Sequence, residues 1–319
     1  MLQRAHDLFC LRRARPDNAH RDHIMGMLRE MKLASQEDLV LCFAGVGSAF
    51  AKKNAQTSLI VAKNGVTLLV DMGTTIPLAL SQHDIEVTDF DYYHFTHSHA
   101  DHIGGVEELL LSARYAQKPR PRVLITETHQ DLLWERSLRG GCEHNEAGLV
   151  RFSDLVRPLR PHWLRSEPRE IYQATLGDLE LIIFRTKHIP GDVAQWEQAY
   201  WSTGVLIDGR VLFTADTRFD LGLFADLETS GFPMDNVEAI FHDCQLAGKG
   251  AVHATYQELQ ALPSHLKSKT WLTHYGDDFA QFTPEEQGFA GFAQPWHFYR
   301  YTLAETNSSP SPTPQATSE

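Results

Sequence analysis

A run of twelve residues, HFTHSHADHIGG at positions 94–105, constrains how this chain can fold more than any other segment. It places four histidines and one aspartate within nine positions. In an extended segment alternate side chains point to the same side, so His97 and His99 share one side. Asp101 and His102 follow at the predicted start of a helix. Imidazole and carboxylate groups at this density are typical of a metal site, so the run predicts a strand, a turn that carries ligands, and a helix.

Three more candidate ligands stand directly after apolar runs. His188 follows LIIFRTK, Asp216 follows RVLFTA and His274 follows TWLT. Taken singly, each could be a helix cap or a turn residue, but α/β folds place functional groups at the ends of strands. Their common position and donor chemistry favour one shared site. The candidate metal ligands are His97, His99, Asp101, His102, His188, Asp216 and His274.

These seven side chains offer nitrogen and oxygen donors and no sulfur. Two ions that share one carboxylate would use all of them. Imidazole and carboxylate suit zinc, and manganese or iron are alternatives. We therefore expect two divalent metal ions, with zinc as the first choice.

The arrangement of apolar runs predicts the fold class. Short β-rich runs begin at DLVLCFAG and recur as far as TWLTHYG, with helical patterns at IGGVEELLLSARYAQ and TYQELQALPSHLK. Asn64 and Gly65 separate the runs SLIVAK and VTLLVD, which is a strong hairpin signal. Strands occur in both halves, each with helices, and this favours a layered α/β sandwich over a single wound sheet.

The chain divides into three predicted segments. Residues 1–37 form a polar, helical extension, and residues 38–303 form the α/β domain. Residues 304–319 form a disordered tail of low complexity, which contains TNSSPSPTPQATSE at positions 306–319. The extension carries an apolar stripe that needs covering, either by its own chain or by a second copy. The stripe consists of Ile24, Met27, Leu28 and Met31.

Charge and apolar content exclude several classes of partner. A formal net charge of −12 argues against general nucleic-acid binding, which needs a basic face. No apolar run approaches the length of a membrane span, and the N-terminal residues are too polar for a secretion signal. The four cysteines lie far apart with no CxxC spacing, which indicates reduced thiols. We expect a cytoplasmic protein with no membrane and no stable nucleic-acid partner.

Together with Asp71 in DMG, these motifs resemble the metallo-β-lactamase superfamily over roughly residues 39–298. The resemblance implies that residues 38–303 are an αββα catalytic domain with two metals at one end, and that Asp71 supports the ligand-bearing loop. It also implies two ligand sets joined by Asp216: His97, His99 and His188 for one ion, and Asp101, His102 and His274 for the other. The best-known β-lactamases have a cysteine at the position of Asp216, so β-lactamase activity is not expected.

Other stretches narrow the resemblance to phosphodiesterases. FAGVGSAF, FHDCQ and VHATY resemble the tRNase Z branch, in which an acidic residue orients a histidine that protonates the leaving oxygen. Asp243 and His253 stand at those positions. A sugar alkoxide leaves poorly near neutral pH, so this chemistry needs an acid. His253 could instead be an ordinary residue at the start of the helix in TYQELQAL.

The closest resemblance is to the anti-Pycsar phosphodiesterases, carried by LLWERSLRGGCEHNEAG, FHDCQLAGKGAVHATYQELQALP and WLTHYGDD. It implies a homodimer that hydrolyses 3′,5′-cyclic mononucleotides to 5′-monophosphates and so counters or regulates cyclic nucleotide immune signalling. In this mechanism the metals activate a water molecule that Asp101 orients, and His253 protonates the departing O3′.

Three alternatives stay open. A tRNase Z-like RNA-processing enzyme would need a long basic arm, but His188 and Asp216 are only 28 positions apart with Arg210 as the one basic residue between them. The segment RPLRPHWLRSEPR is another candidate RNA contact. A lactonase or other hydrolase of the same fold, and a nucleotide sensor without turnover, are the remaining alternatives. The complete ligand set together with His253 favours catalysis, since a sensor needs no proton donor.

Overall fold

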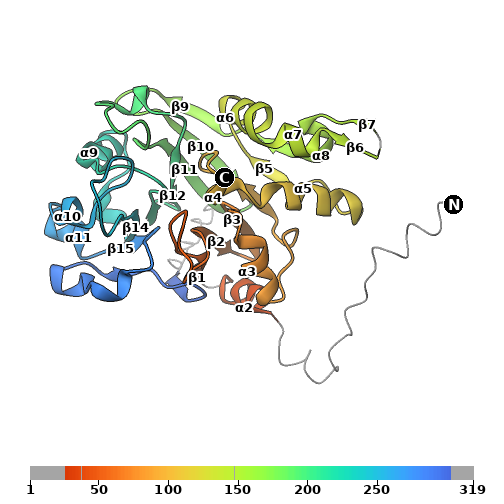
Figure 1. Ribbon diagram of the computed structural model, residues 1–319. Coiled ribbons are helices and arrows are strands. Elements are labelled where there is room, and N and C mark those ends of the chain that lie inside the picture. Colours follow the sequence, from red (N-terminus) through yellow and green to blue (C-terminus); the bar gives the residue numbers. More distant parts are fainter. Residues whose placement is uncertain (1–25, 37, 147, 303–319) are drawn as a thin grey trace, which may run out of the picture.

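The computed structural model of the chain describes residues 26–36, 38–146 and 148–302. In this part, two β-sheets lie face to face and helices cover their outer faces (Figure 1). α3 (Ile76–Gln82) and α5 (Val106–Tyr115) lie on one side of the pair, and α9 (Leu221–Thr229) lies on the other. The predicted αββα sandwich is confirmed.

The first sheet comes from the N-terminal half of the chain and is completed by the last described strand, in the order β17-β1-β2-β3-β4-β5-β8. β17, β1, β2 and β3 pair antiparallel, whereas β3, β4, β5 and β8 pair in parallel. Asn64 and Gly65 join β2 to β3 with positive φ at both residues, which is the predicted hairpin turn. The strands are β1 (Asp38–Gly45), β2 (Ser58–Lys63), β3 (Val66–Val70), β4 (Tyr92–His94), β5 (Arg122–Leu124), β8 (Arg157–Leu159) and β17 (Phe298–Thr302).

The second sheet follows the order β16-β15-β14-β13-β12-β11-β10-β9. β13 to β16 pair in parallel, and β9 to β13 pair antiparallel. The strands are β9 (His162–Arg165), β10 (Ile171–Leu176), β11 (Leu179–Arg185), β12 (Thr203–Ile207), β13 (Val211–Phe213), β14 (Ala239–Asp243), β15 (Thr270–Thr273) and β16 (Gly291–Phe292), and a separate hairpin joins β6 (His144–Asn145) to β7 (Gly148–Leu149).

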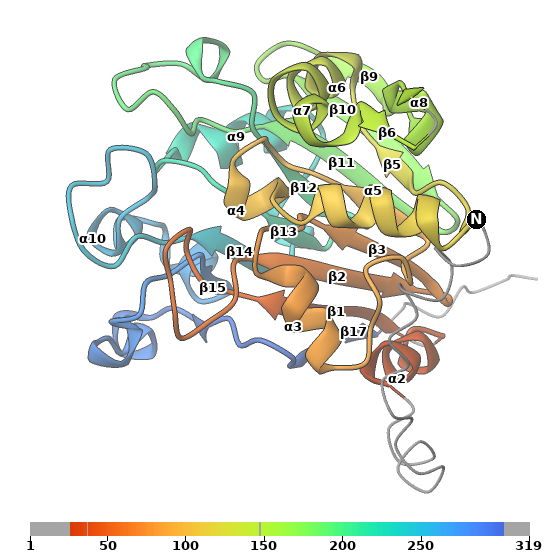
Figure 2. The same cartoon turned by 45° about the vertical axis from the view of Figure 1, so that its right-hand side comes forward.

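Most of the remaining helices are short. Figure 2 shows α3 and α5 crossing in front of the first sheet. The α-helices not yet named are α2 (Met27–Ala34), α4 (Ala100–Ile103), α6 (Glu127–Leu133), α7 (Arg139–Cys142), α8 (Phe152–Leu155), α10 (Tyr256–Leu259) and α11 (Ser264–Lys267). A π-helix, η2 (Trp134–Leu138), joins α6 to α7, and the 3-10 helices are η3 (Trp196–Gln198), η4 (Met234–Asn236), η5 (Phe279–Gln281) and η6 (Pro284–Gln287).

Alternation along β1 explains why the sandwich has two apolar layers. Leu39, Leu41 and Phe43 belong to the cluster shared with the second sheet, and Val40 and Cys42 belong to the cluster beneath α3 and α5. Successive side chains of a strand point to opposite faces, so an uninterrupted apolar run fills both layers. β1 is therefore a central strand that is covered on both sides.

The strand directions bring the C-terminal ends of six strands to the same end of the sandwich. β3 and β4 run parallel in the first sheet, as do β13, β14 and β15 in the second. β11 runs in the same direction as β13, because both pair antiparallel with β12. The loops after these strands carry the predicted site residues.

Two segments predicted as single helices are divided in the structure. α4 and α5 are separated at Gly104 and Gly105, and a Cβ on Gly104 would collide with Thr74. α10 and α11 are separated by a turn before Pro263, which lacks the N–H that a helix interior needs. In addition, RVLITET was predicted as one strand, but β5 ends early because Thr126 caps α6 by accepting the His129 N–H.

Several strands were not predicted. β8, β9 and β10 lie in a stretch for which the sequence indicated no strand, and β16 and β17 follow the last predicted run. β9 lies at the edge of its sheet, and its side chains are exposed or half-buried. Such a strand lacks the apolar alternation by which a half-buried strand is recognised.

The predicted N-terminal extension is described only from residue 26, where it forms α2. Met31 is fully buried, and Met27 and Leu28 pack against the same cluster. The described part of the apolar stripe is thus covered by its own chain. Ile24, the rest of residues 1–25 and the predicted tail at 304–319 lie outside the described residues.

Among the residues described, no helix combines the length and apolarity that crossing a membrane requires. Cys42, Cys142 and Cys244 are free and buried, in agreement with the wide spacing of the cysteines in the sequence.

Close packing of two loop backbones generates a prediction about Gly73. The Met72 N–H donates to the His102 carbonyl at 2.7 Å, and a Cβ on Gly73 would lie far inside van der Waals contact with the Asp101 carbonyl. Gly73→Ala should therefore lower the free energy of unfolding by roughly 1–3 kcal/mol, the usual cost of overpacking. Gly140→Ala is the matched control.

Gly140 has open space around its Cβ position and lies in α7, so alanine there should leave stability unchanged or slightly higher. Chemical denaturation of both variants measures the difference. Equal stability of the two variants would show that the backbone contact at Gly73 is not tight.

Candidate active site

The structure brings all the predicted site residues together at one end of the sandwich. His97 and His99 follow β4, while Asp101 and His102 lie in the short helix α4. His188, Asp216 and His274 come from the loops after β11, β13 and β15, and Asp71 directly follows β3. The site is thus assembled from both sheets, as the strand ends suggested.

One group of donor atoms gathers around His99. The ligand atoms of His97, His99, His188 and Asp216 all lie within 4.8 Å of one another. The Nδ1 atom of His99 is 3.0 Å from Nε2 of His97 and 3.2 Å from Nε2 of His188. Lone pairs of neutral imidazoles repel each other when they converge in this way, so the arrangement favours a cation between them.

A second group shares the same aspartate. The donor atoms of Asp101, His102, Asp216 and His274 also lie within 4.8 Å of one another, and all four residues are buried. Nε2 of His102 is 3.2 Å from Oδ1 of Asp216, and Nε2 of His274 is 3.2 Å from Oδ2 of Asp101. The two groups therefore meet at Asp216, where the sequence resemblance predicted a shared carboxylate.

Unsatisfied buried atoms show that the pocket fits divalent cations. Both carboxylate oxygens of Asp216 and Nε2 of His102 are buried and make no hydrogen bond. A buried anion of this kind needs positive charge beside it. The donor set of imidazoles and carboxylates matches zinc, manganese and iron.

Asp71 orients the ligand-bearing turn. Its carboxylate accepts hydrogen bonds from the backbone N–H and the hydroxyl of Thr96, both at 2.7 Å. Its Oδ2 also lies 2.7 Å from Nδ1 of His102. A carboxylate only accepts, so His102 is protonated on Nδ1 and presents the lone pair of Nε2 to the pocket.

A backbone carbonyl orients the ring of His188 in the same way. Nδ1 of His188 lies 2.7 Å from the carbonyl oxygen of Val252 and donates to it, which leaves Nε2 free to face Asp216. The sequence indicated neither Thr96 nor Val252. No residue type marks a backbone carbonyl as a partner, and a threonine before a histidine is too common to be a signal.

Three residues at or beside the site have a strained backbone. Asp71, Ala215 and His274 have φ angles of 64°, 49° and 57°, in the left-handed region that side chains disfavour. Ala215 directly precedes Asp216. Strain of this kind costs about 1–3 kcal/mol for each residue and persists only where the surrounding structure imposes it. The fold therefore holds these ligands in place against the local preference of the backbone.

The buried Asp243 pairs with the partly exposed His253 beside these donor groups. Oδ2 of Asp243 lies 2.8 Å from Nδ1 of His253 and accepts the Thr217 N–H at 2.9 Å. Burial would lower the pKa of His253, but the charge and hydrogen bond of Asp243 outweigh it, so that the pKa is raised. Thr255, and not His253, caps α10 by accepting the Glu258 N–H. His253 is therefore free of the capping role that the sequence left open.

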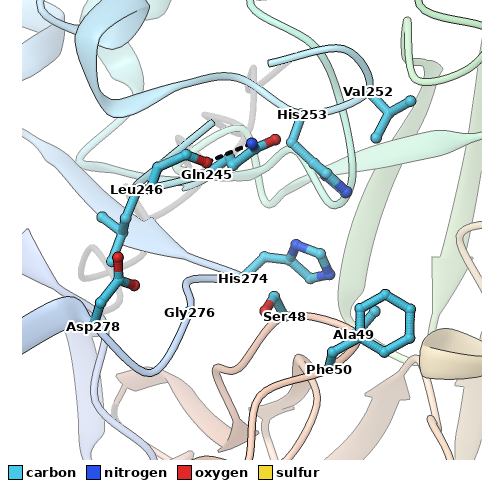
Figure 3. Close-up of a pocket in the computed structure, with 11 residues that line it drawn as sticks. Ser48, Ala49, Phe50, Gln245, Leu246, Val252, His253, His274, Gly276 and Asp278 are labelled. Atoms are coloured by element: carbon cyan, nitrogen blue, oxygen red, sulfur yellow. Dashed lines mark hydrogen bonds between the residues drawn. The ribbon is translucent and has the colours of Figure 1, made fainter. Parts of the chain in front are cut away.

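The His253 side chain faces a cavity of about 360 Å³ (Figure 3). This volume lies within the range of small-molecule sites, roughly 300–1,000 Å³. The cavity is lined by Ser48, Ala49, Phe50, Gln245, Leu246, Ala247, Val252, His253, His274, Gly276 and Asp278. The candidate proton donor His253 and the candidate metal ligand His274 therefore face a cavity whose wall is mainly apolar.

Known proteins resemble this chain in sequence and in structure. The model of the family described as anti-Pycsar protein Apyc1 matches residues 39–299. Anti-Pycsar protein Apyc1 of Paenibacillus harenae is 35% identical over 238 residues, which are 75% of this chain and 90% of that protein. The protein of the same name from Bacillus phage vB_BsuM-Goe3 is 31% identical over 252 residues, 76% of this chain and 91% of the phage protein.

Among solved structures, the metallo-β-lactamase fold protein YhfI from Bacillus subtilis is similar with a TM-score of 0.61 and 15% sequence identity. The match covers 83% of this chain and 100% of that protein. At this identity the likeness shows the fold. The fold and the extent of the sequence match lead to one conclusion: this chain belongs to the anti-Pycsar protein Apyc1 family and has the metallo-β-lactamase fold.

Proposed function

We propose that the protein is a metal-dependent phosphodiesterase that hydrolyses 3′,5′-cyclic mononucleotides to 5′-monophosphates. The observation that carries this proposal is the Asp243–His253 pair beside the metal cluster, with 2.8 Å between carboxylate and imidazole. A sugar alkoxide leaves poorly without a proton, and the Asp243–His253 pair can donate one. The relatives are named anti-Pycsar proteins, which supports a role for this chain in countering Pycsar signalling.

Two divalent metal ions, with zinc as the first choice, form part of the proposal. His97, His99 and His188 would hold one ion, Asp101, His102 and His274 the other, and Asp216 both. Asp216 belongs to both of these donor groups, which supports this division, and a third group joins Asp216 and His274 to Asp243 and His253. Ions held there would lower the pKa of a water molecule and neutralise charge on the phosphoryl oxygens. Asp101, which is slightly more exposed than Asp216, would orient the attacking water.

The Asp243–His253 pair would transfer the proton. Asp243 fixes the ring of His253 through Nδ1, so that Nε2 is the atom left to face the substrate. The charge and hydrogen bond of Asp243 raise the pKa of His253, which favours the protonated form that a proton donor needs. Asp243 itself is fully buried, which restricts it to positioning the ring. His253 would then donate its proton to O3′ as the P–O3′ bond breaks.

Structural observations weigh against the alternatives. The basic segment considered for RNA binding contains Arg169, which is 2% exposed and paired with Asp220 and Asp226 at 2.8 and 2.9 Å. Residues 189–215 form η3, β12 and β13 and no long basic arm. Lactone hydrolysis does not need the proton donor, and neither does a sensor.

The resemblance also implies a homodimer, which we retain as part of the proposal. The apolar stripe of the N-terminal helix gives it no support, because Met31 is buried within its own chain. The dimer therefore rests on the resemblance alone.

Metal content should depend on the two ligand groups in different ways. The wild-type protein should bind close to two ions per chain, His97→Ala should lose mainly one, and Asp216→Ala should lose both because its carboxylate serves both groups. Elemental analysis after dialysis measures this. His144→Ala is the control, since that side chain is 77% exposed and belongs to none of the donor groups found among the described residues. Retention of both ions in both ligand variants would contradict the assignment.

The loss of activity on substitution of His253 should depend on the leaving group of the substrate. His253→Ala should keep its metal and fold but lose roughly 10²- to 10⁴-fold in kcat/KM on a cyclic nucleotide, the usual contribution of a general acid. The loss should be much smaller on a nitrophenyl phosphodiester, whose leaving group departs unprotonated. Asp243→Asn should be milder, because that residue positions the ring.

Product analysis with a panel of cyclic nucleotides and a precursor tRNA provides the measurement. Equal losses on both substrates would show that His253 binds phosphate and does not transfer a proton. Cleavage of the precursor tRNA with no turnover of cyclic nucleotides would replace the proposed function with RNA processing.

A further inference from the structure

The most exposed large apolar side chain in the described part of the chain lies at the cavity. Phe50 is 87% exposed and comes from the loop between β1 and β2. Figure 3 shows its ring turned toward the cavity, on the side that faces His253 and His274. Burial of a phenylalanine side chain stabilises a protein by about 1.5–3 kcal/mol, so an exposed ring gives up that gain. Its exposure at this place therefore points to contact with a ligand.

The loop that carries Phe50 is held firmly at its base. The carboxylate of Asp277 accepts the backbone N–H groups of Lys52 and Lys53 at 2.9–3.0 Å. On the other side, the Ser48 N–H donates to the Tyr275 carbonyl at 3.0 Å. Both anchors lie in the loop after β15, directly after His274. The position of the ring is thus coupled to the metal-ligand loop.

The wall around the ring suits a flat, weakly polar group. Ala49, Leu246 and Val252 line the cavity together with Phe50. In Figure 3, Ser48, Ala49 and Phe50 lie on one side of the cavity, and Gln245, Leu246 and Val252 lie on the other. In a cyclic nucleotide the base is joined to the sugar on the side away from the phosphate. A phosphate at the histidines would therefore leave the base among these apolar side chains.

We propose that the Phe50 ring stacks on the nucleobase of the substrate and thereby sets its affinity. This inference rests on the proposed cyclic nucleotide phosphodiesterase activity. Every base has an aromatic face, so stacking on phenylalanine tolerates different bases. Phe50 then contributes to binding in the ground state and in the transition state alike, and its loss raises KM while kcat is kept.

Steady-state kinetics of Phe50→Ala, Phe50→Leu and Phe50→Tyr test the inference on two substrates. One is 3′,5′-cyclic AMP, and the other is the abasic 3′,5′-cyclic ribose phosphate, which has the same reacting group and no base. For cyclic AMP, the alanine and leucine variants should raise KM roughly 5- to 100-fold with little change in kcat, the range found when stacked aromatics are removed. The tyrosine variant should keep the wild-type KM. On the abasic substrate all variants should match the wild type.

Trp163→Ala is the matched control, since Trp163 is an exposed aromatic on β9 that does not line the cavity. Equal losses on both substrates, or full rescue by leucine, would overturn the stacking role while leaving the phosphodiesterase intact. So would a change of oligomeric state in Phe50→Ala by light scattering, which would assign the ring to a contact between copies. If the wild type turns over neither substrate, the proposed function fails, and the stacking role fails with it.

Discussion

A carboxylate that is buried without any hydrogen bond carries one of the largest penalties in protein folding, several kcal/mol even after the surroundings relax. Asp216 is such a group, with both oxygens buried and unpaired. Imidazoles of His97, His102, His188 and His274 lie 3.2–3.8 Å from it. His97 and His102 follow β4 of the first sheet, whereas His188 and His274 come from loops of the second. Cations held around Asp216 would therefore join the two sheets, and folding and metal binding should be coupled.

The supporting structure explains how such a site keeps its geometry. Three left-handed residues and the hydrogen bonds of Asp71 fix the direction in which each ligand points. The backbone contact between Gly73 and Asp101 packs two of the loops against each other. Precise ligand placement requires partners of this kind, because side chains on unsupported loops sample many positions. In this fold the supporting residues are as necessary as the ligands.

The sequence made the grouping of these candidate ligands predictable because its signals are local or repeated. The run at 94–105 contains four of the seven candidate ligands. The other three, His188, Asp216 and His274, each directly follow an apolar run. The Asp243–His253 pair was recognised through resemblance, since ten positions separate residues that meet only in the fold. Val252 could not be found in this way, because it acts through a backbone carbonyl. In the sequence Phe50 looks like an ordinary core residue, and only the structure shows that its ring is exposed.

Anomalous diffraction from crystals of the zinc-loaded protein tests most directly whether Asp216 joins two metal ions. We expect two peaks about 3.5–4 Å apart, the usual spacing of two-metal sites, one on each side of the Asp216 carboxylate. One peak should lie among His97, His99 and His188, and the other among Asp101, His102 and His274. A single peak, or a second peak away from Asp216, would contradict a shared role of this carboxylate.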